Sequence, residues 1–92
     1  MEFVWDENKN RSNLKKHKIA FEDAIPVFFD EHAIAFEDDR FDYQDGQRMI
    51  IIGANKHGIL YVAYAEVEGE IIRIISARPA EPPEIKLYQQ GY

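Results

Sequence analysis

Three side chains that can contact an anion or move a proton recur along one stretch near the start of the chain. Lys9, Asn13 and His17 are spaced four residues apart within the polar segment 6–18, DENKNRSNLKKHK. That spacing places them on one face of a helix. Together they can contact a phosphate, and histidine can transfer a proton near neutral pH. Lysines and histidines on polar helices are usually only solvated. The pattern by itself therefore makes this face a candidate site and does not establish one.

Two arginines interrupt the most apolar strand, residues 71–79, IIRIISARP. Burying an unpaired guanidinium is costly. Arg73 and Arg78 therefore either pair with structural carboxylates, as Arg73 would with Glu66, or face an anion from outside the chain. In a regular strand, side-chain alternation puts the two arginines on opposite faces. We expect them to share a face only if Arg78 lies past the strand end, where Pro79 follows.

These groups would suit RNA cleavage without a metal. That reaction needs a base for the 2′-hydroxyl, positive charge around the phosphate and an acid for the leaving oxygen. The strand arginines, the cationic helix face and Tyr88 near the C-terminus could supply them, although composition equally allows a protein-binding surface. Zinc is not expected, because the three histidines lack ligand spacing and cysteine is absent. The sequence contains neither a phosphate-cradling glycine loop nor a nucleophile elbow.

Two helices are expected in the first third of the chain. Segment 6–18 begins at Asp6, a favourable N-cap. Its single apolar residue, Leu14, should hold it on the surface together with the flanking Trp5 and Ile19. Segment 21–29, FEDAIPVFF, has apolar residues at the spacing of an amphipathic helix. Pro26 should kink that helix or delay its start.

The rest of the chain predicts strands and one more helix. Strands are expected at 2–5, 32–38, 48–53, 59–67 and 70–77, a charged loop with an Asp45-Gly46 turn at 38–47, and a helix at 83–90. We therefore predict one compact α+β domain over residues 1–92. It has an antiparallel β-sheet of four or more strands, two N-terminal helices and a C-terminal helix.

Length, cysteine content and charge limit the kinds of environment and partner that the chain can have. The 92 residues suffice for one domain, and no apolar stretch is long enough to span a membrane. The absence of cysteine agrees with a reducing cytoplasm. A net charge of −6 argues at first against nucleic acid, but the charge is uneven, at +2 over residues 1–18 and −7 over residues 19–48. A basic N-terminal element can therefore face a polyanion while the acidic middle faces solvent or a basic protein.

Three blocks, in order, resemble the BrnT toxin family. The opening FVWDENKNRSNLKKHKIAFEDA is similar to the family block aromatic-x-W-D-x-x-K-x-x-x-N-x-x-K-H-x-[IV]-x-F-x-x-A. RMIIIG and the apolar strand after it resemble the middle of the family. IRIISAR, followed by Glu84 and Tyr88, is similar to the closing block I-R-I-I-S-A-R…E-x-x-x-Y. The blocks span nearly the whole chain.

The resemblance implies a function. BrnT proteins are toxins of bacterial type II toxin–antitoxin pairs, with a fold like that of RelE ribonucleases, and they cleave RNA without a metal or other cofactor. A DNA-binding antitoxin, BrnA, neutralises them, and the complex represses its own operon. The chain is thus expected to be a cytoplasmic endoribonuclease that inhibits growth, with RNA as substrate and a BrnA-like antitoxin as partner in a hetero-tetramer.

The resemblance also implies which residues act. His17 would be the general acid or base, and Lys9, Arg73 and Arg78 would hold the scissile phosphate. Tyr88 is a secondary candidate for proton transfer. The remaining matched positions with an implied RNA contact are Trp5, Asn13 and Arg48, whereas Phe21 and Gly53 match as structural residues.

Two departures from the family pattern keep other functions open. The family often has a His-Thr pair late in the central strand, where this chain has Ala65 and Glu66. The tail after SAR is usually rich in arginine, but here it is PAEPPEIK. The alternative is therefore a catalytically weakened or inactive toxin-fold protein that acts as an antitoxin-binding module. A third interpretation is a housekeeping domain whose arginines are salt-bridged.

Overall fold

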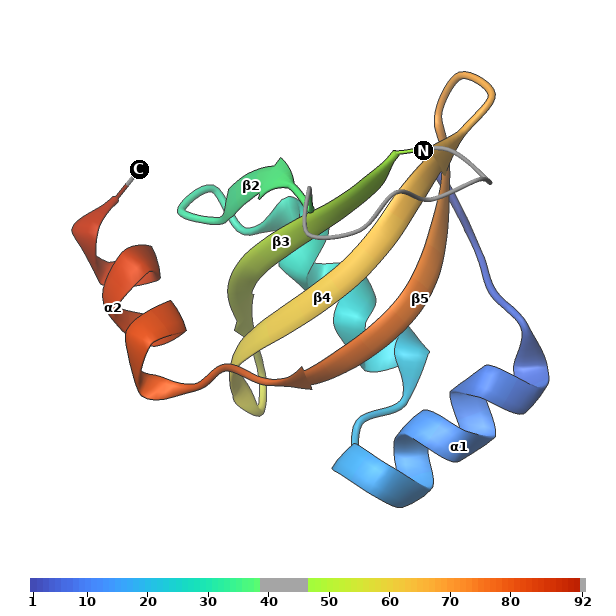
Figure 1. Cartoon of the computed structure of the whole chain (residues 1–92), viewed down its shortest axis with the longest axis horizontal. Coiled ribbons are helices and arrows are strands. Elements are labelled where there is room, and N and C mark those ends of the chain that lie inside the picture. The colour runs from blue at the N-terminus through green and yellow to red at the C-terminus, as the bar shows by residue number, and fades with distance from the viewer. Residues whose placement is uncertain (39–46, 92) are drawn as a thin grey trace.

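The computed structural model describes residues 1–38 and 47–91, so the expected Asp45-Gly46 turn lies outside the described residues. Its elements, in chain order, are β1 (Glu2–Val4), α1 (Glu7–His17), the 3₁₀ helix η1 (Phe21–Phe29), β2 (Ile34–Glu37), β3 (Arg48–Asn55), β4 (Gly58–Val67), β5 (Ile71–Pro79) and α2 (Pro82–Gln90). Figure 1 shows α1 and α2 at opposite ends of the molecule, with the sheet between them. No helix in the described ranges is long and apolar enough to cross a membrane.

The sheet has five strands in the order β1-β5-β4-β3-β2. Strands β2 to β5 each pair antiparallel with the next, as predicted for the sheet. The sheet as a whole is mixed, because β1 pairs parallel with β5, with Phe3 opposite Ile72. The prediction of an antiparallel sheet was therefore wrong at this edge. The two paired strands are far apart in sequence, so no hairpin sets their direction, and only the packing of the segments between them decides it.

One side of the sheet, here called the core face, is covered by η1 (Figure 1). Segment 21–29 is a 3₁₀ helix rather than the expected amphipathic α-helix, and it starts at Phe21 without delay. A 3₁₀ helix has three residues per turn, so Phe21, Ala24 and Val27 form one line. All three are fully buried, each with 0% of its surface exposed.

Gly53 on β3 lets η1 approach the core face closely. A Cβ atom at this position would lie 2.8 Å from Val27 Cγ1 and 3.1 Å from the Val27 carbonyl oxygen. Real Cβ atoms do not approach so closely, so this glycine is required by packing. The structural role implied for Gly53 by the resemblance therefore has a specific physical basis.

The helix α1 is docked by asparagines and not by Leu14. Leu14 is 48% exposed, so the prediction was wrong for this residue, whereas the flanking Trp5 and Ile19 pack with the core. Asn10 and Asn13 are instead buried on the inner side of α1. The Asn10 side chain accepts a hydrogen bond from the Phe21 backbone N–H at 2.8 Å and donates to Glu22 at 3.1 Å. A helix with almost no apolar residues is thus attached through amide hydrogen bonds.

The opposite side of the sheet, here called the arginine face, carries a second, smaller apolar cluster. Ile34, Ile50 and Ile52 form it, and Tyr88 of α2 packs against them. The helix α2 begins with a capping box in which the side chains of Glu81 and Glu84 bond each other's backbone N–H groups. The helix lies at one end of the sheet and covers only that end of the arginine face (Figure 1).

Candidate active site

An irregularity in β5 places the two arginines of IIRIISARP. Ser76 and Ile74 pair with consecutive residues of β4, so Ile75 between them is an extra residue, a β-bulge. A bulge shifts the alternation of side chains in the strand that contains it. Arg73, before the bulge, and Arg78, after it, therefore lie on the same side of the sheet, the arginine face.

The burial pattern agrees with this shift. Ala77 is fully buried on the core face together with Ile72 and Ile74. Strict alternation along the strand would put Ala77 on the same side as Arg73. The expectation of regular alternation was therefore wrong in β5. Arg78 also lies within β5 and not past its end. The arginines share a face because of the bulge, and no residue type in the sequence predicts a bulge at this position.

Three cations from three elements line one cavity. Arg48 of β3 pairs with Ala65 of β4, and Ala65 pairs with Arg73 of β5. The two arginines therefore lie on either side of a small residue of the central strand. Lys9 of α1 lines the same cavity, which has a volume of about 120 Å³ and is completed by Asp6, Ile74 and Ile75. Three of the described lining residues are cationic and one is a carboxylate, a lining that can attract an anion.

Hydrogen bonds at the start of α1 position Lys9. The Asp6 carboxylate accepts hydrogen bonds from the backbone N–H groups of Asn8, at 2.8 Å, and Lys9, at 3.2 Å. This is the expected N-cap. It fixes the first turn of α1 beside the part of β5 that carries Arg73.

Asn13 fixes the middle of α1 against the edge of β5. Its side-chain amide donates to the Ala77 carbonyl at 2.7 Å and accepts from the Ala77 N–H at 3.1 Å, as a neighbouring strand would. It also donates to the Ile19 carbonyl at 2.8 Å. With 7% of its surface exposed, Asn13 holds the helix in place, and its RNA contact stays a prediction.

A second groove adjoins the cavity along α1. Its volume is about 230 Å³, and it contains Lys9, which lines both spaces, and the half-buried His17. The predicted face of α1 is therefore real. The groove is lined by Lys9, Ser12, Asn13, Lys16, His17, Ile75 and Ser76. Sequence reasoning passed over Ser12 and Lys16, although their positions three and seven residues after Lys9 place them on the same helix face.

Arg78 is engaged by α2. Its guanidinium donates two hydrogen bonds to the Glu84 carboxylate, both at 2.8 Å, and lies 4.0 Å from the centre of the Tyr61 ring. The hydrogen bond to Glu84 raises the pKa of Arg78 further above its ordinary value, against the opposing effect of burial. Arg78 thus ties the start of α2 to the sheet, about 15 Å along the strand from Arg73.

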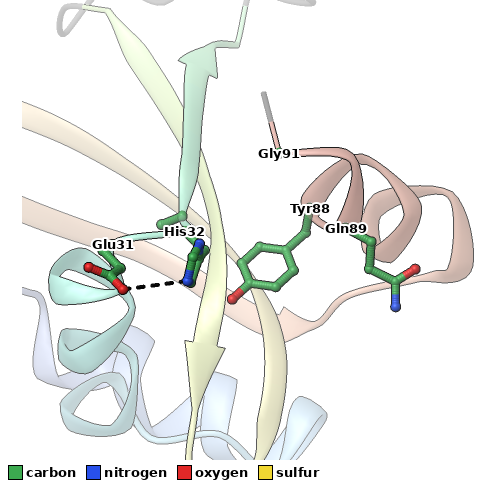
Figure 2. Close-up of a pocket in the computed structure, with 6 residues that line it drawn as sticks. Glu31, His32, Tyr88, Gln89 and Gly91 are labelled. Atoms are coloured by element: carbon green, nitrogen blue, oxygen red, sulfur yellow. Dashed lines mark ion pairs between the residues drawn. The ribbon is translucent and has the colours of Figure 1, made fainter.

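Tyr88 also lies apart from Lys9 and His17, because α2 and α1 are at opposite ends of the molecule (Figure 1). Its hydroxyl donates to the Asp30 carboxylate at 2.7 Å, and this hydrogen bond raises the pKa of Tyr88. Figure 2 shows the Tyr88 ring extending from α2 toward His32, which pairs with Glu31 at 3.5 Å. Among the described residues, this pocket of about 330 Å³ is lined by the Glu31 carboxylate and by no lysine or arginine, so it is unfavourable for a phosphate.

Trp5 packs rather than projects. Its ring meets the Phe21 ring edge-on at 6.0 Å between centroids, and its indole N–H donates to Glu7 at 3.3 Å. The structure thus brings together Lys9, Arg48 and Arg73 and places His17 in the adjoining groove. In the part of the chain that is described, no three histidine or carboxylate side chains are grouped so that they could hold a metal ion.

Residues 5–84 match the family described as the ribonuclease toxin, BrnT, of type II toxin–antitoxin systems. Among solved structures, the ribonuclease toxin BrnT of Brucella abortus is similar, with a TM-score of 0.68 and 30% sequence identity over 88% of this chain and 97% of that chain. Comparison with functionally curated proteins gives no match. The chain belongs to the BrnT family of ribonuclease toxins of type II toxin–antitoxin systems.

Proposed function

We propose that this chain is a metal-independent endoribonuclease that cleaves RNA in the cytoplasm and thereby inhibits growth. The observation that carries the proposal is the cavity where Lys9, Arg48 and Arg73 converge from α1, β3 and β5. Cations held on separate rigid elements can surround a phosphate and stabilise the charge that develops on it. We further propose the RelE-like fold that the family resemblance implies.

In the proposed reaction the RNA 2′-hydroxyl attacks the neighbouring phosphorus. A base removes the hydroxyl proton, the bond between phosphorus and the 5′-oxygen breaks, and an acid protonates that leaving oxygen. Lys9, Arg48 and Arg73 hold the phosphate. His17, in the groove that shares Lys9 with the cavity, transfers a proton.

The other expected residues support the site at a distance. Trp5 and Asn13 hold α1, which carries Lys9 and His17. Arg78 and Tyr88 hold α2 through Glu84 and Asp30. We assign them to positioning, because none of them lines the cavity and each contacts a neighbouring element of the fold.

The partner of a type II toxin is an antitoxin, and family membership implies one for this chain. We propose a BrnA-type antitoxin that neutralises the toxin in a hetero-tetramer. The acidic segment 19–48, with a net charge of −7, would suit a basic, DNA-binding protein.

One observation favours the alternative of an inactive antitoxin-binding module. Ala65, between Arg48 and Arg73, occupies the place where the family often has a group able to transfer protons. Without such a group, the cavity could bind a phosphate and leave it intact.

Cleavage of an RNA oligonucleotide in EDTA tests the proposal. The purified protein should cut the RNA, and Arg73→Ala should lower the rate at least a hundredfold, because it removes a charge that stabilises the transition state. Arg11→Ala is the matched control: Arg11 is exposed on α1 and lines neither the cavity nor the groove. Equal rates for parent and Arg73→Ala would refute the assignment. A folded parent that binds its antitoxin but cuts no RNA would establish the alternative.

A further inference from the structure

We infer that Ser12, Lys16 and Ser76 form a subsite for a second phosphate, so that the substrate is single-stranded RNA lying along α1. This inference rests on the proposed function and extends it: the cavity at Arg73 takes the scissile phosphate, and the groove takes a neighbouring one. Neither Ser12 nor Lys16 has a part in the cleavage step proposed above.

The first support is the length of the cationic surface. Lys9 and Lys16 are seven residues apart on α1, which is about 10 Å along the helix axis. Lys9 lines both spaces, whereas Lys16 lines only the groove. A single phosphate at Arg73 therefore cannot engage the whole surface, and the remaining cation and hydroxyl groups have room for another.

The second support is the chemistry of the groove lining. It contains Lys9, Lys16 and His17, and among the described lining residues there is no carboxylate. Ser12 and Ser76 add hydroxyl groups that can donate hydrogen bonds to phosphate oxygens. The cavity at Arg73, by contrast, includes Asp6. The groove is thus equipped for an anion at least as well as the cavity beside it.

The bulge in β5 lies at the junction between the cavity and the groove. Ile75, the extra residue, lines both the cavity and the groove, and Ser76 after it lines the groove. An apolar side chain at the junction of two cationic spaces suits a ribose or base between two phosphates. That is the repeat of a nucleic-acid strand.

The end of α1 explains why Lys16 matters individually. The groove runs along α1 from Lys9 to His17, and its Lys16 end lies at the C-terminal end of the helix, where the helix dipole and the last carbonyl groups are negative. Backbone N–H groups of α1 do not point there. A phosphate must therefore be held by side chains, and Lys16 supplies the charge. A single strand fits this requirement, since its bases can turn away from the groove while its backbone follows it.

Non-cleavable probes test the subsite apart from catalysis. The ligands are 2′-O-methyl oligonucleotides with one phosphate, a dinucleotide, or with two, a trinucleotide, without terminal phosphates. The parent should bind the two-phosphate probe roughly tenfold more tightly, the worth of one charge-assisted contact. Lys16→Ala should remove that gain and leave the one-phosphate probe unaffected. Each phosphate contact releases counterions, so Lys16→Ala should also reduce the salt dependence of the affinity for the two-phosphate probe.

Lys15→Ala is the matched control, with the same loss of charge one residue away. Lys15 lines neither the cavity nor the groove. Its variant should retain the full gain, and a blunt 2′-O-methyl duplex should compete poorly. Equal losses in Lys15→Ala and Lys16→Ala would overturn the subsite, and so would a one-phosphate probe that binds as well as the longer one.

Failure of the subsite and failure of the proposed function are distinguishable. A parent that shows the two-phosphate gain but cuts no cleavable RNA keeps the subsite and refutes the nuclease. A parent that cuts RNA without the gain keeps the nuclease and refutes the subsite.

Discussion

Removal of one buried amide should loosen the element that carries Lys9 and His17. Asn13→Ala deletes three hydrogen bonds, to the Ile19 carbonyl at 2.8 Å and to the carbonyl and N–H groups of Ala77 at 2.7 and 3.1 Å. Those backbone groups are buried and would lose their partner. The one apolar residue of α1, Leu14, is 48% exposed and cannot compensate.

The expected loss follows from these bonds. Each backbone group left without a partner costs about 1 kcal/mol, toward the low end because water can reach the helix edge. Alanine returns roughly 0.5 kcal/mol through its higher helix propensity. The free energy of unfolding should therefore fall by about 2.5 kcal/mol, which is a large share of the stability of a domain of this size.

Urea unfolding followed by circular dichroism measures this change. A loss of that size lowers the midpoint by about 2 M urea for a small domain. Asn8→Ala is the matched control: Asn8 is exposed on the same helix, so its variant should stay within about 0.5 kcal/mol of the parent. If Asn13→Ala were no less stable than Asn8→Ala, the proposal that an asparagine pairs with the edge of β5 would be refuted.

Three further perturbations test other parts of the structure. Gly53→Ala should destabilise by about 1–3 kcal/mol, because its Cβ would lie 2.8 Å from Val27 Cγ1; an unchanged thermal midpoint would contradict this packing. Glu84→Gln should cost about 1.5 kcal/mol by weakening the paired hydrogen bonds to Arg78, and a loss equal to that of Glu81→Gln would contradict it. Burial alone would raise the pKa of Asp30, but hydrogen bonds to its carboxylate outweigh burial and lower the pKa. Its stabilisation is therefore complete above the ordinary value of about 3.9 and is lost as pH falls through the lowered pKa. Asp30→Asn should flatten the acid limb of stability against pH, and an unchanged limb would contradict that assignment.

Much of the local structure could be predicted from residue types. Asp6 is an N-cap because its carboxylate can reach backbone N–H groups within its own turn, and the structure shows those bonds. The meander β3 to β5 follows from apolar strands joined by short turns. The face with Lys9 and His17 follows from helical periodicity. Each of these features depends on residues close together in the chain.

Other features depend on contacts between distant segments. Segment 21–29 has the apolar spacing of an amphipathic α-helix, but close packing on Gly53 favours a 3₁₀ helix. The parallel pairing of β1 has no local signal. Arg78 and Tyr88 match the family pattern as strongly as Arg73, yet their partners on other elements make them anchors of α2.

The sequence by itself determined the family, the α+β class and the helix face with Lys9 and His17, and it predicted a role for the arginines in β5. It could do so because motifs and periodicity are properties of neighbouring residues. Only the tertiary structure decided which of these residues meet. The bulge at Ile75 moved Arg78 to the face of Arg73, and the pairing of three strands brought Arg48 to Arg73. The hydrogen bonds between the Asn13 amide and Ala77 fix the position of α1 along β5, and in that position Lys9 lines the cavity. Register and bulges arise from the balance of many long-range contacts, which no short stretch of sequence contains.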